Sequence, residues 1–333
     1  MITRLAVSLT LLTLVWSLSA QAQSQYHLID LDTFVPVAIS DHTLGPEVIS
    51  NVGSELGRWS KLSGFKFPAP GVPALATGAS NGGAIVGLGG GCNAEEGVTE
   101  SFYWTEAHGF QCLLARGSDT LALGVNNAGE IVGRAIQDTG NVRGALYWPN
   151  AASPAENLFF ASQAAATAIN RQGVAIGWFT CDSHQPCQDG TFVAAPSVDV
   201  VVPLVGDFRI VAVTDDNDFL ITQAGNGYIV APFQFYTLGQ PIGCTETAYV
   251  ALNTNLQVIG DSLCEGTRQA WTWTPAIGFR QLTSVLNMRG WEFHRATAIN
   301  TNGWIVGMAS FNGVPHGYAL APVPPYVWVD SQR

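Results

Sequence analysis

A phrase of twelve residues returns along this chain, and its repetition restricts the folds available. Residues 166–177 read ATAINRQGVAIG, and residues 296–307 read ATAINTNGWIVG. Weaker copies occupy residues 46–57, 76–87, 122–133, 211–222 and 249–260. Successive copies end 30, 46, 44, 45, 38 and 47 residues apart. Such a period, with strand-like content, is typical of a repeat architecture in which each unit packs on its neighbours.

Each phrase reads as a β-hairpin. A short apolar run ends at a turn-forming residue, and Gly follows three residues later, as at Asn170 and Gly173. This spacing is typical of a type I turn, after which Gly takes the positive φ of a bulge. The Gly is missing at Asp218 and Leu256, where Asn255 is the alternative left-handed residue. The turn position holds Ser50, Ser80, Asn126, Asn170, Asp215, Asn253 and Asn300.

Two further strand-like segments follow most phrases. The third is rich in aromatic residues, as in residues 101–104, 144–148 and 269–273, and a shorter fourth closes several units. Four strands in roughly 44 residues make a β-propeller blade. We therefore expect an all-β propeller of seven four-stranded blades. The weakness of the phrases at 46–57 and 211–222 leaves six or eight blades open.

The ends of the repeat predict how the ring closes. The seventh copy runs out after its third strand, near residues 320–323. Residues 26–31, by contrast, read as a strand with no phrase of its own. As the fourth strand of the last blade, this segment would close the circle and remove exposed sheet edges. We expect one propeller domain over residues 23–325, followed by a tail at 326–333.

The first 22 residues predict export. Arg4 precedes an apolar stretch at residues 5–18, and residues 20–22 offer an A-x-A cleavage site before Gln23. The stretch is shorter than an ordinary transmembrane helix. We therefore expect a signal peptide, a secreted or periplasmic protein, and no membrane insertion after cleavage. An N-terminal membrane anchor is the alternative.

The net charge of the chain restricts the classes of partner that it could bind. Of 14 basic and 25 acidic residues, only Arg4 lies in the predicted signal, which leaves 13 basic residues against 25 acidic ones. An acidic chain without a basic run disfavours nucleic acid and anionic membranes, where neutralising phosphates supplies much of the affinity. We expect a monomer that binds a ligand or a protein.

The order of these segments resembles the bacterial extracellular HAF-repeat family. Residues 26–31 match its Y-x-x-x-D-L opening, and residues 166–177 and 296–307 match its A-I-N-x-x-G-x-I-V-G hairpin. Residues 316–318 and 269–271 come nearest to the name-giving triplet, which never occurs intact. The resemblance covers most of residues 26–323 and implies an exported bacterial protein of unassigned activity. It assigns no catalytic residues.

Several short motifs suggest chemistry but fit the repeat better. Ser80 lies in a G-x-S-x-G sequence, yet the hydrolase elbow needs a following helix, so we interpret Ser80 as a turn residue. Asp215, Asp216 and Asp218 resemble the start of a calcium loop, but the Gly and Glu required at positions six and twelve are absent. We treat these acids as candidate ligand contacts on a degenerate turn. The six His residues show no zinc spacing, and we expect no metal or cofactor.

A second region breaks the repeat just before the seventh hairpin. Trp291, Glu292, His294 and Arg295 stand where other copies carry mostly small or apolar residues. Binding residues concentrate on loops held by a rigid scaffold. This cluster is therefore a candidate ligand contact at the rim of a blade, with a solvated loop as the alternative.

Six cysteines in an exported chain predict disulfides. Cys92, Cys181 and Cys264 each follow the last Gly of a phrase by four or five residues, so they mark the same end of the second strand. Metal ligation, the alternative, lacks a C-x-x-C spacing. Because bonded cysteines need close β-carbons, partners within a blade are favoured. The expected pairs are Cys92–Cys112, Cys181–Cys187 and Cys244–Cys264.

These observations favour a secreted propeller that binds a ligand or protein through its loops without catalysis. Propellers also host enzymes, so the fold does not decide the function. The alternatives are a hydrolase or lyase acting on an extracellular polymer and a structural component of the envelope or matrix. An enzyme should gather pattern-breaking acids, His or Arg on one face. The question for the structure is whether regions 215–218 and 291–295 meet.

Overall fold

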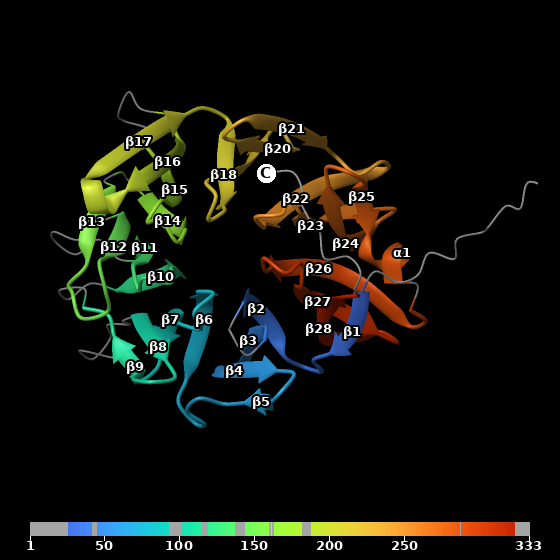
Figure 1. The fold of residues 1–333 in the computed structure, drawn as a ribbon, viewed down its shortest axis with the longest axis horizontal. Helices are drawn as coiled ribbons and strands as arrows, with labels where there is room; N and C mark the ends of the chain where they lie inside the picture. The colour runs from blue at the N-terminus through green and yellow to red at the C-terminus, as the bar shows by residue number, and fades with distance from the viewer. Residues whose placement is uncertain are drawn as a thin grey trace, which may run out of the picture.

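Seven four-stranded antiparallel sheets stand in a ring in the computed structural model of this chain (Figure 1). The structure describes residues 26–41, 45–92, 101–114, 119–136, 144–159, 161, 163–181, 188–286 and 288–323. The ring is a seven-bladed β-propeller, which confirms the predicted fold class and blade count. No helix within these ranges has the length and apolarity to cross a membrane.

Blades 1 to 6 each take their strands from one stretch of the chain, and in every blade the first strand lies nearest the centre (Figure 1). Blades 1 and 2 consist of β2 (Val35–Ser40), β3 (Glu47–Val52), β4 (Glu55–Ser60) and β5 (Gly64–Lys66), then β6 (Ala74–Ala79), β7 (Ile85–Gly89), β8 (Ser101–Thr105) and β9 (Gly109–Cys112). Blades 3 and 4 consist of β10 (Thr120–Val125), β11 (Ile131–Ala135), β12 (Ala145–Trp148) and β13 (Glu156–Phe159), then β14 (Gln163–Ile169), β15 (Ala175–Thr180), β16 (Gly190–Ala195) and β17 (Val200–Val205). Blade 5 consists of β18 (Phe208–Val213), β19 (Phe219–Gln223), β20 (Asn226–Ala231) and β21 (Gln234–Gly239). Blade 6 consists of β22 (Cys244–Leu252), β23 (Val258–Cys264), β24 (Thr267–Thr274) and β25 (Gly278–Gln281), followed by the short helix α1 (Leu282–Leu286).

The N-terminal strand completes blade 7, as the sequence predicts. This blade holds β26 (Trp291–Ile299), β27 (Ile305–Phe311), β28 (Val314–Pro322) and β1 (Tyr26–Asp30). Strand β1 pairs antiparallel with β28, and the blue strand lies beside the red ones in Figure 1. The phenol oxygen of Tyr26 accepts a hydrogen bond from Gln257 Nε2 of blade 6 at 2.8 Å. The first strand of the described chain therefore completes the sheet of the last blade and contacts the blade before it.

The prediction that residues 46–57 form the first hairpin of a blade is wrong. These residues form β3 and the start of β4, the second and third strands of blade 1. Ser50 lies inside β3, where it pairs with Pro36 and Gly57, and so is not a turn residue. Gly53, with φ of 59°, supplies the turn between β3 and β4. The same turn chemistry thus serves another hairpin, and the sequence pattern does not distinguish the two.

Two other turns differ from expectation by one residue each. In blade 5 the turn begins at Thr214, whose N–H donates to the Asp218 carbonyl at 2.9 Å, and not at Asp215. Asn217, with φ of 63°, takes the left-handed position there. In blade 6, Leu256 itself adopts φ of 56°, so Asn255 does not replace the missing Gly. The pairing of the flanking strands determines where the turn lies, and the residue at the left-handed position adopts a positive φ even when it is not Gly.

The last Gly of the phrase has a packing role. A Cβ on Gly177 would lie 2.2 Å from the Ala165 carbonyl oxygen and 2.3 Å from the Phe192 ring. The first strand bulges between Ala166 and Ala168, opposite this point. An aromatic ring of the third strand covers the gap in the same way at Gly87, Gly260 and Gly307. Close approach, and not a positive φ, explains why this position is Gly.

Two of the three expected disulfides are present. Cys92 and Cys112 join blade 2 with a Cα–Cα distance of 5.2 Å, and Cys244 and Cys264 join β22 to β23 with one of 4.2 Å. Both are pairs within a blade, as predicted. Cys187 lies outside the described residues, so its pairing with Cys181 stays a prediction.

Candidate functional site

The ring has two faces that are built differently. In blades 2 to 7 the turn between the first and second strands lies on one side, which we call the turn face. It comprises residues 80–84, 126–130, 170–174, 214–218, 253–257 and 300–304. Because the strands alternate in direction, the first strands begin and the second strands end on the opposite side, which we call the far face.

Asn residues join neighbouring blades on the turn face. The Asn170 side-chain oxygen accepts the N–H groups of Gln172 and Val174 at 3.0 and 2.9 Å, which closes its own turn. Its Nδ2 donates to the Thr214 carbonyl of the next blade at 2.8 Å. Asn126 and Asn253 make the equivalent bonds to the next turn. These buried residues are structural, and they hold the turn face rigid.

A pocket of about 110 Å³ opens on this face near the centre of the ring. It is formed where the first strands of blades 2, 3 and 4 end and where the turn of blade 5 begins. Its polar lining residues are Ser80, Asn81, Asn126, Asn127, Arg171 and Asp215. Four blades therefore contribute polar groups to one small volume.

Arg171 and Asp215 are the charged groups of the pocket. Asp215 Oδ1 accepts the backbone N–H of Arg171 at 2.8 Å, and its carbonyl accepts Gln172 Nε2 at 2.9 Å. The carboxylate is thus held by backbone, while the exposed Arg171 guanidinium makes no ion pair within the described ranges. Asn127 Oδ1 accepts the Gly82 N–H at 2.7 Å, so the Asn127 amide nitrogen carries the two donors of this side chain. The pocket therefore combines one cationic residue, Arg171, with the Asp215 carboxylate and several neutral polar groups.

The other two predicted acids of this region lie outside the pocket lining. Asp218 is buried, and Thr214 Oγ1 donates to its carboxylate at 3.1 Å, so it supports the turn. Asp216 is exposed, and its backbone N–H donates to Thr214 Oγ1. Among the described residues, no group of three or more His, Cys, Asp or Glu side chains could hold a metal ion.

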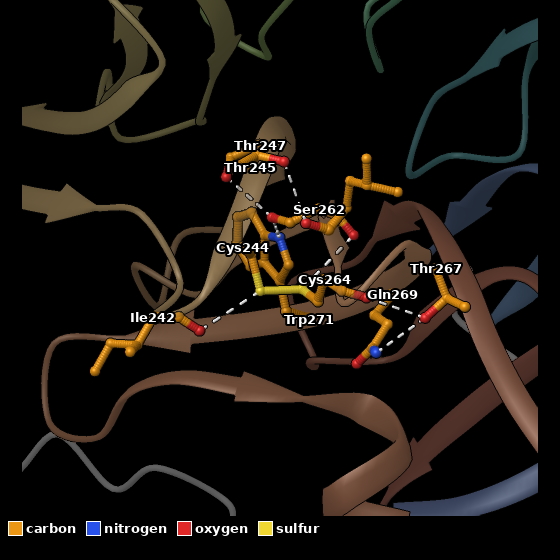
Figure 2. The surroundings of a disulfide bond; sticks show 10 residues. Ile242, Cys244, Thr245, Thr247, Ser262, Cys264, Thr267, Gln269 and Trp271 are labelled. Carbon is orange, nitrogen blue, oxygen red and sulfur yellow. Dashed lines mark hydrogen bonds between the residues drawn. A yellow bond between two sulfur atoms is a disulfide. The ribbon is translucent and has the colours of Figure 1, made fainter.

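On the far face, blades 6 and 7 depart from the repeat. Their first strands, β22 and β26, are nine residues long and carry two register shifts each, whereas the other first strands carry one. The extra shift falls between Thr245 and Ala248 in β22 and between Phe293 and Arg295 in β26. The Cys244–Cys264 disulfide spans the far end of the β22–β23 hairpin (Figure 2). Blades 6 and 7 therefore present a longer and braced rim.

Arg268 is the central charge of this rim. Its Nη1 lies 2.5 Å from Asp261 Oδ1, and its Nη2 lies 3.1 Å from Glu246 Oε2. Asp261 is only 5% exposed, so the pair is partly shielded from water. The hydrogen bond with Asp261 raises the pKa of Arg268, although burial opposes this. The guanidinium fixes the start of β24 beside β22.

His294 sits at the added bulge of β26. Its Nδ1 lies 3.2 Å from the Arg268 carbonyl of blade 6, and its Nε2 lies 3.0 Å from Ser310 Oγ of β27. Trp291 packs on Phe311 with a ring separation of 5.2 Å. Glu292 and Arg295, the remaining residues of the predicted cluster, have exposed side chains.

The two regions predicted from the sequence do not meet. Residues 215–218 lie on the turn face, at the end of a first strand, whereas residues 291–295 begin a first strand on the far face. No single channel mouth gathers both sets. The structure instead adds Arg171 to the first region and Arg268 with Ser310 to the second. One feature of the sequence could have identified Arg171: it follows the turn residue Asn170, at a position of the repeated turn where the residue type varies between copies.

Comparison with known proteins identifies the fold alone. No family model and no curated protein matches this chain. Virginiamycin B lyase from Staphylococcus aureus is 12% identical, with a TM-score of 0.50, and the match covers 90% of this chain and 100% of that one. A prolyl endopeptidase is 8% identical (TM-score 0.55; 89% of this chain, 51% of that one), and a puromycin hydrolase is 14% identical (TM-score 0.55; 83% and 50%). The match thus spans about half of each of the last two chains.

Proposed function

We propose that this chain is an exported binding protein whose turn-face pocket holds an anionic group of its ligand. The observation that carries the proposal is Arg171, an exposed residue without an ion pair to a described residue, which lines a pocket to which four blades contribute. Guanidinium groups bind carboxylates and phosphates through two parallel hydrogen bonds. Asn127 and Asn81 add neutral polar groups beside it.

The dimensions of the pocket indicate what kind of ligand it suits. A volume of about 110 Å³ admits a head group but not a whole drug-sized molecule. The rest of the ligand would therefore extend over the turn face, as an acidic polysaccharide or an acidic protein segment would. Because the Asn side chains fix the turns before binding, the pocket loses little conformational freedom when a ligand enters.

Three features support export as part of this proposal. Residues 1–22 have the order of a signal peptide. The Cys92–Cys112 and Cys244–Cys264 disulfides are compatible with an extracellular or periplasmic location. The resemblance to HAF repeats points to the same compartment.

A titration followed by NMR tests the binding site. Galacturonate, glutamate and inorganic phosphate are added separately to isotope-labelled protein covering residues 23–333. We expect at least one probe to shift the Gly82 and Arg171 amide signals saturably, and Arg171→Ala to abolish the shift.

Arg209→Ala is the matched control, because Arg209 is an exposed arginine of β18 that does not line the pocket. The control should bind like the unaltered protein. Equal saturable shifts with Arg171→Ala, or no saturable shift with any probe, would contradict the proposal.

A further inference from the structure

Three groups stand in line on the far face, away from the proposed binding pocket. Ser310 Oγ lies 3.0 Å from His294 Nε2, and His294 Nδ1 lies 3.2 Å from the Arg268 carbonyl oxygen. The three residues belong to β27, β26 and β24, so two blades contribute. A hydroxyl, an imidazole and an orienting acceptor in this order are the parts of a nucleophilic site.

The Arg268 carbonyl determines the tautomer of His294. A carbonyl oxygen only accepts hydrogen bonds, so Nδ1 of His294 must carry the proton. In the neutral imidazole, Nε2 is then the unprotonated nitrogen and faces Ser310 Oγ. The Ser310 hydroxyl therefore donates to Nε2. His294 is held in the form that removes a proton from Ser310.

The surrounding residues fix this geometry. Asp261 and Glu246 hold the Arg268 side chain at 2.5 and 3.1 Å, and β24 carries its carbonyl. The Cys244–Cys264 disulfide braces the adjoining hairpin (Figure 2). A base held by a rigid second layer needs little reorganisation during a proton transfer.

Ser310 differs from serines nearby. Ser262 Oγ accepts Trp271 Nε1–H at 2.9 Å and bonds to Thr247, so it is buried among neutral partners (Figure 2). Ser284 Oγ donates to the Gln281 carbonyl at 2.7 Å. Neither faces a base. Ser310 and His294 are both half-buried at the rim.

We propose that Ser310 is an acyl-accepting nucleophile and His294 its general base, in the hydrolysis of esters. Ser310 Oγ bonds to the ester carbonyl carbon while its proton passes to His294 Nε2. The C–O bond to the leaving alcohol breaks, and the alcohol takes that proton. Solvent water then attacks the acyl-serine, gives a proton to His294 and releases the acid; the proton returns to Ser310.

The orienting group indicates the substrate class. A neutral carbonyl stabilises the imidazolium formed during attack less than a carboxylate does. The site should therefore act on esters with good leaving groups, and much less on amides. This activity is independent of the turn-face pocket, because Arg171 and Ser310 lie on opposite faces.

Covalent labelling tests the proposal. The protein covering residues 23–333 is incubated with a fluorophosphonate, from which a serine oxygen displaces fluoride, and the labelled residue is located by peptide mass mapping. We expect label on Ser310 and none there in Ser310→Ala.

His294→Gln separates activation from folding, since Gln presents both a donor and an acceptor but no basic nitrogen. We expect its labelling rate to fall at least about 100-fold, in line with typical general-base contributions. Ser284→Ala is the matched control and should label at the normal rate. Absence of label on Ser310, or equal rates with His294→Gln, would overturn the proposal, provided that the variants melt like the parent.

Discussion

At the scale of single residues, the repeated phrase combines turn chemistry with joints between blades. Asn at the turn position accepts two backbone N–H groups with its oxygen and donates with its nitrogen to the next blade. Thr214 closes its turn with a hydroxyl but has no amide to donate onward. The preference for Asn over other turn formers is therefore a property of the ring and not of the isolated hairpin.

The last Gly of the phrase gives a prediction at the same scale. Gly177→Ala would place a methyl group 2.2 Å from the Ala165 carbonyl oxygen, so the first strand or Phe192 must move. We expect the free energy of unfolding to fall by about 3 kcal/mol, in the range of core overpacking. Chemical denaturation measures it. Gly82→Ala is the control, because its nearest contact would be 3.3 Å away, and an equal loss there would contradict the steric explanation.

At the scale of strands and hairpins, the far-face rim depends on added bulges that no sequence pattern marks. His294 was identified from the sequence because it breaks the repeat, but Ser310 and Arg268 were not. Ser310 lies in β27, beyond the end of the phrase, and Arg268 lies in β24 of the neighbouring blade, so its carbonyl meets His294 only across the boundary between the blades. On the turn face, Arg171 joins the pocket only when four blades are assembled. Local patterns predict hairpins, whereas sites formed between blades need the ring.

The Cys244–Cys264 disulfide gives a prediction at this scale. Replacing both cysteines with Ser opens a loop of 20 residues, which the loop-entropy model values at about 3 kcal/mol. The loss should be local, because the ring retains its other blades. We expect faster amide hydrogen exchange in β22 and β23 and unchanged exchange in blade 3. Exchange that rises equally around the ring would show that the disulfide supports the whole fold.

At the scale of the whole molecule, the sequence predicted the ring because strand content, period and the two chain ends agree. The blade count survived the wrong placement of residues 46–57, since blade 1 still has four strands in that region. The seam between blades 7 and 1 was not predicted. There Asp41 accepts the Thr301 N–H at 3.1 Å and Asn302 Nδ2 at 3.0 Å, much as Asp215 accepts the Arg171 N–H between blades 4 and 5. The seam therefore uses a contact that also occurs inside the ring.

Ring closure gives the last prediction. Deleting residues 23–32 removes β1, exposes the edge of β28 and takes Tyr26 and Leu31, 6% and 0% exposed, out of the core. Burial of two such side chains contributes about 5 kcal/mol, so the melting temperature should fall by roughly 10 °C or more. The free edge should also promote association, seen by size-exclusion chromatography. His27→Ala, an exposed position on β1, is the control and should melt normally. A synthetic peptide of residues 23–34 should restore the melting temperature in trans, because the backbone of β28 keeps its pairing groups. Unchanged melting after the deletion would mean that the ring is closed by its other contacts.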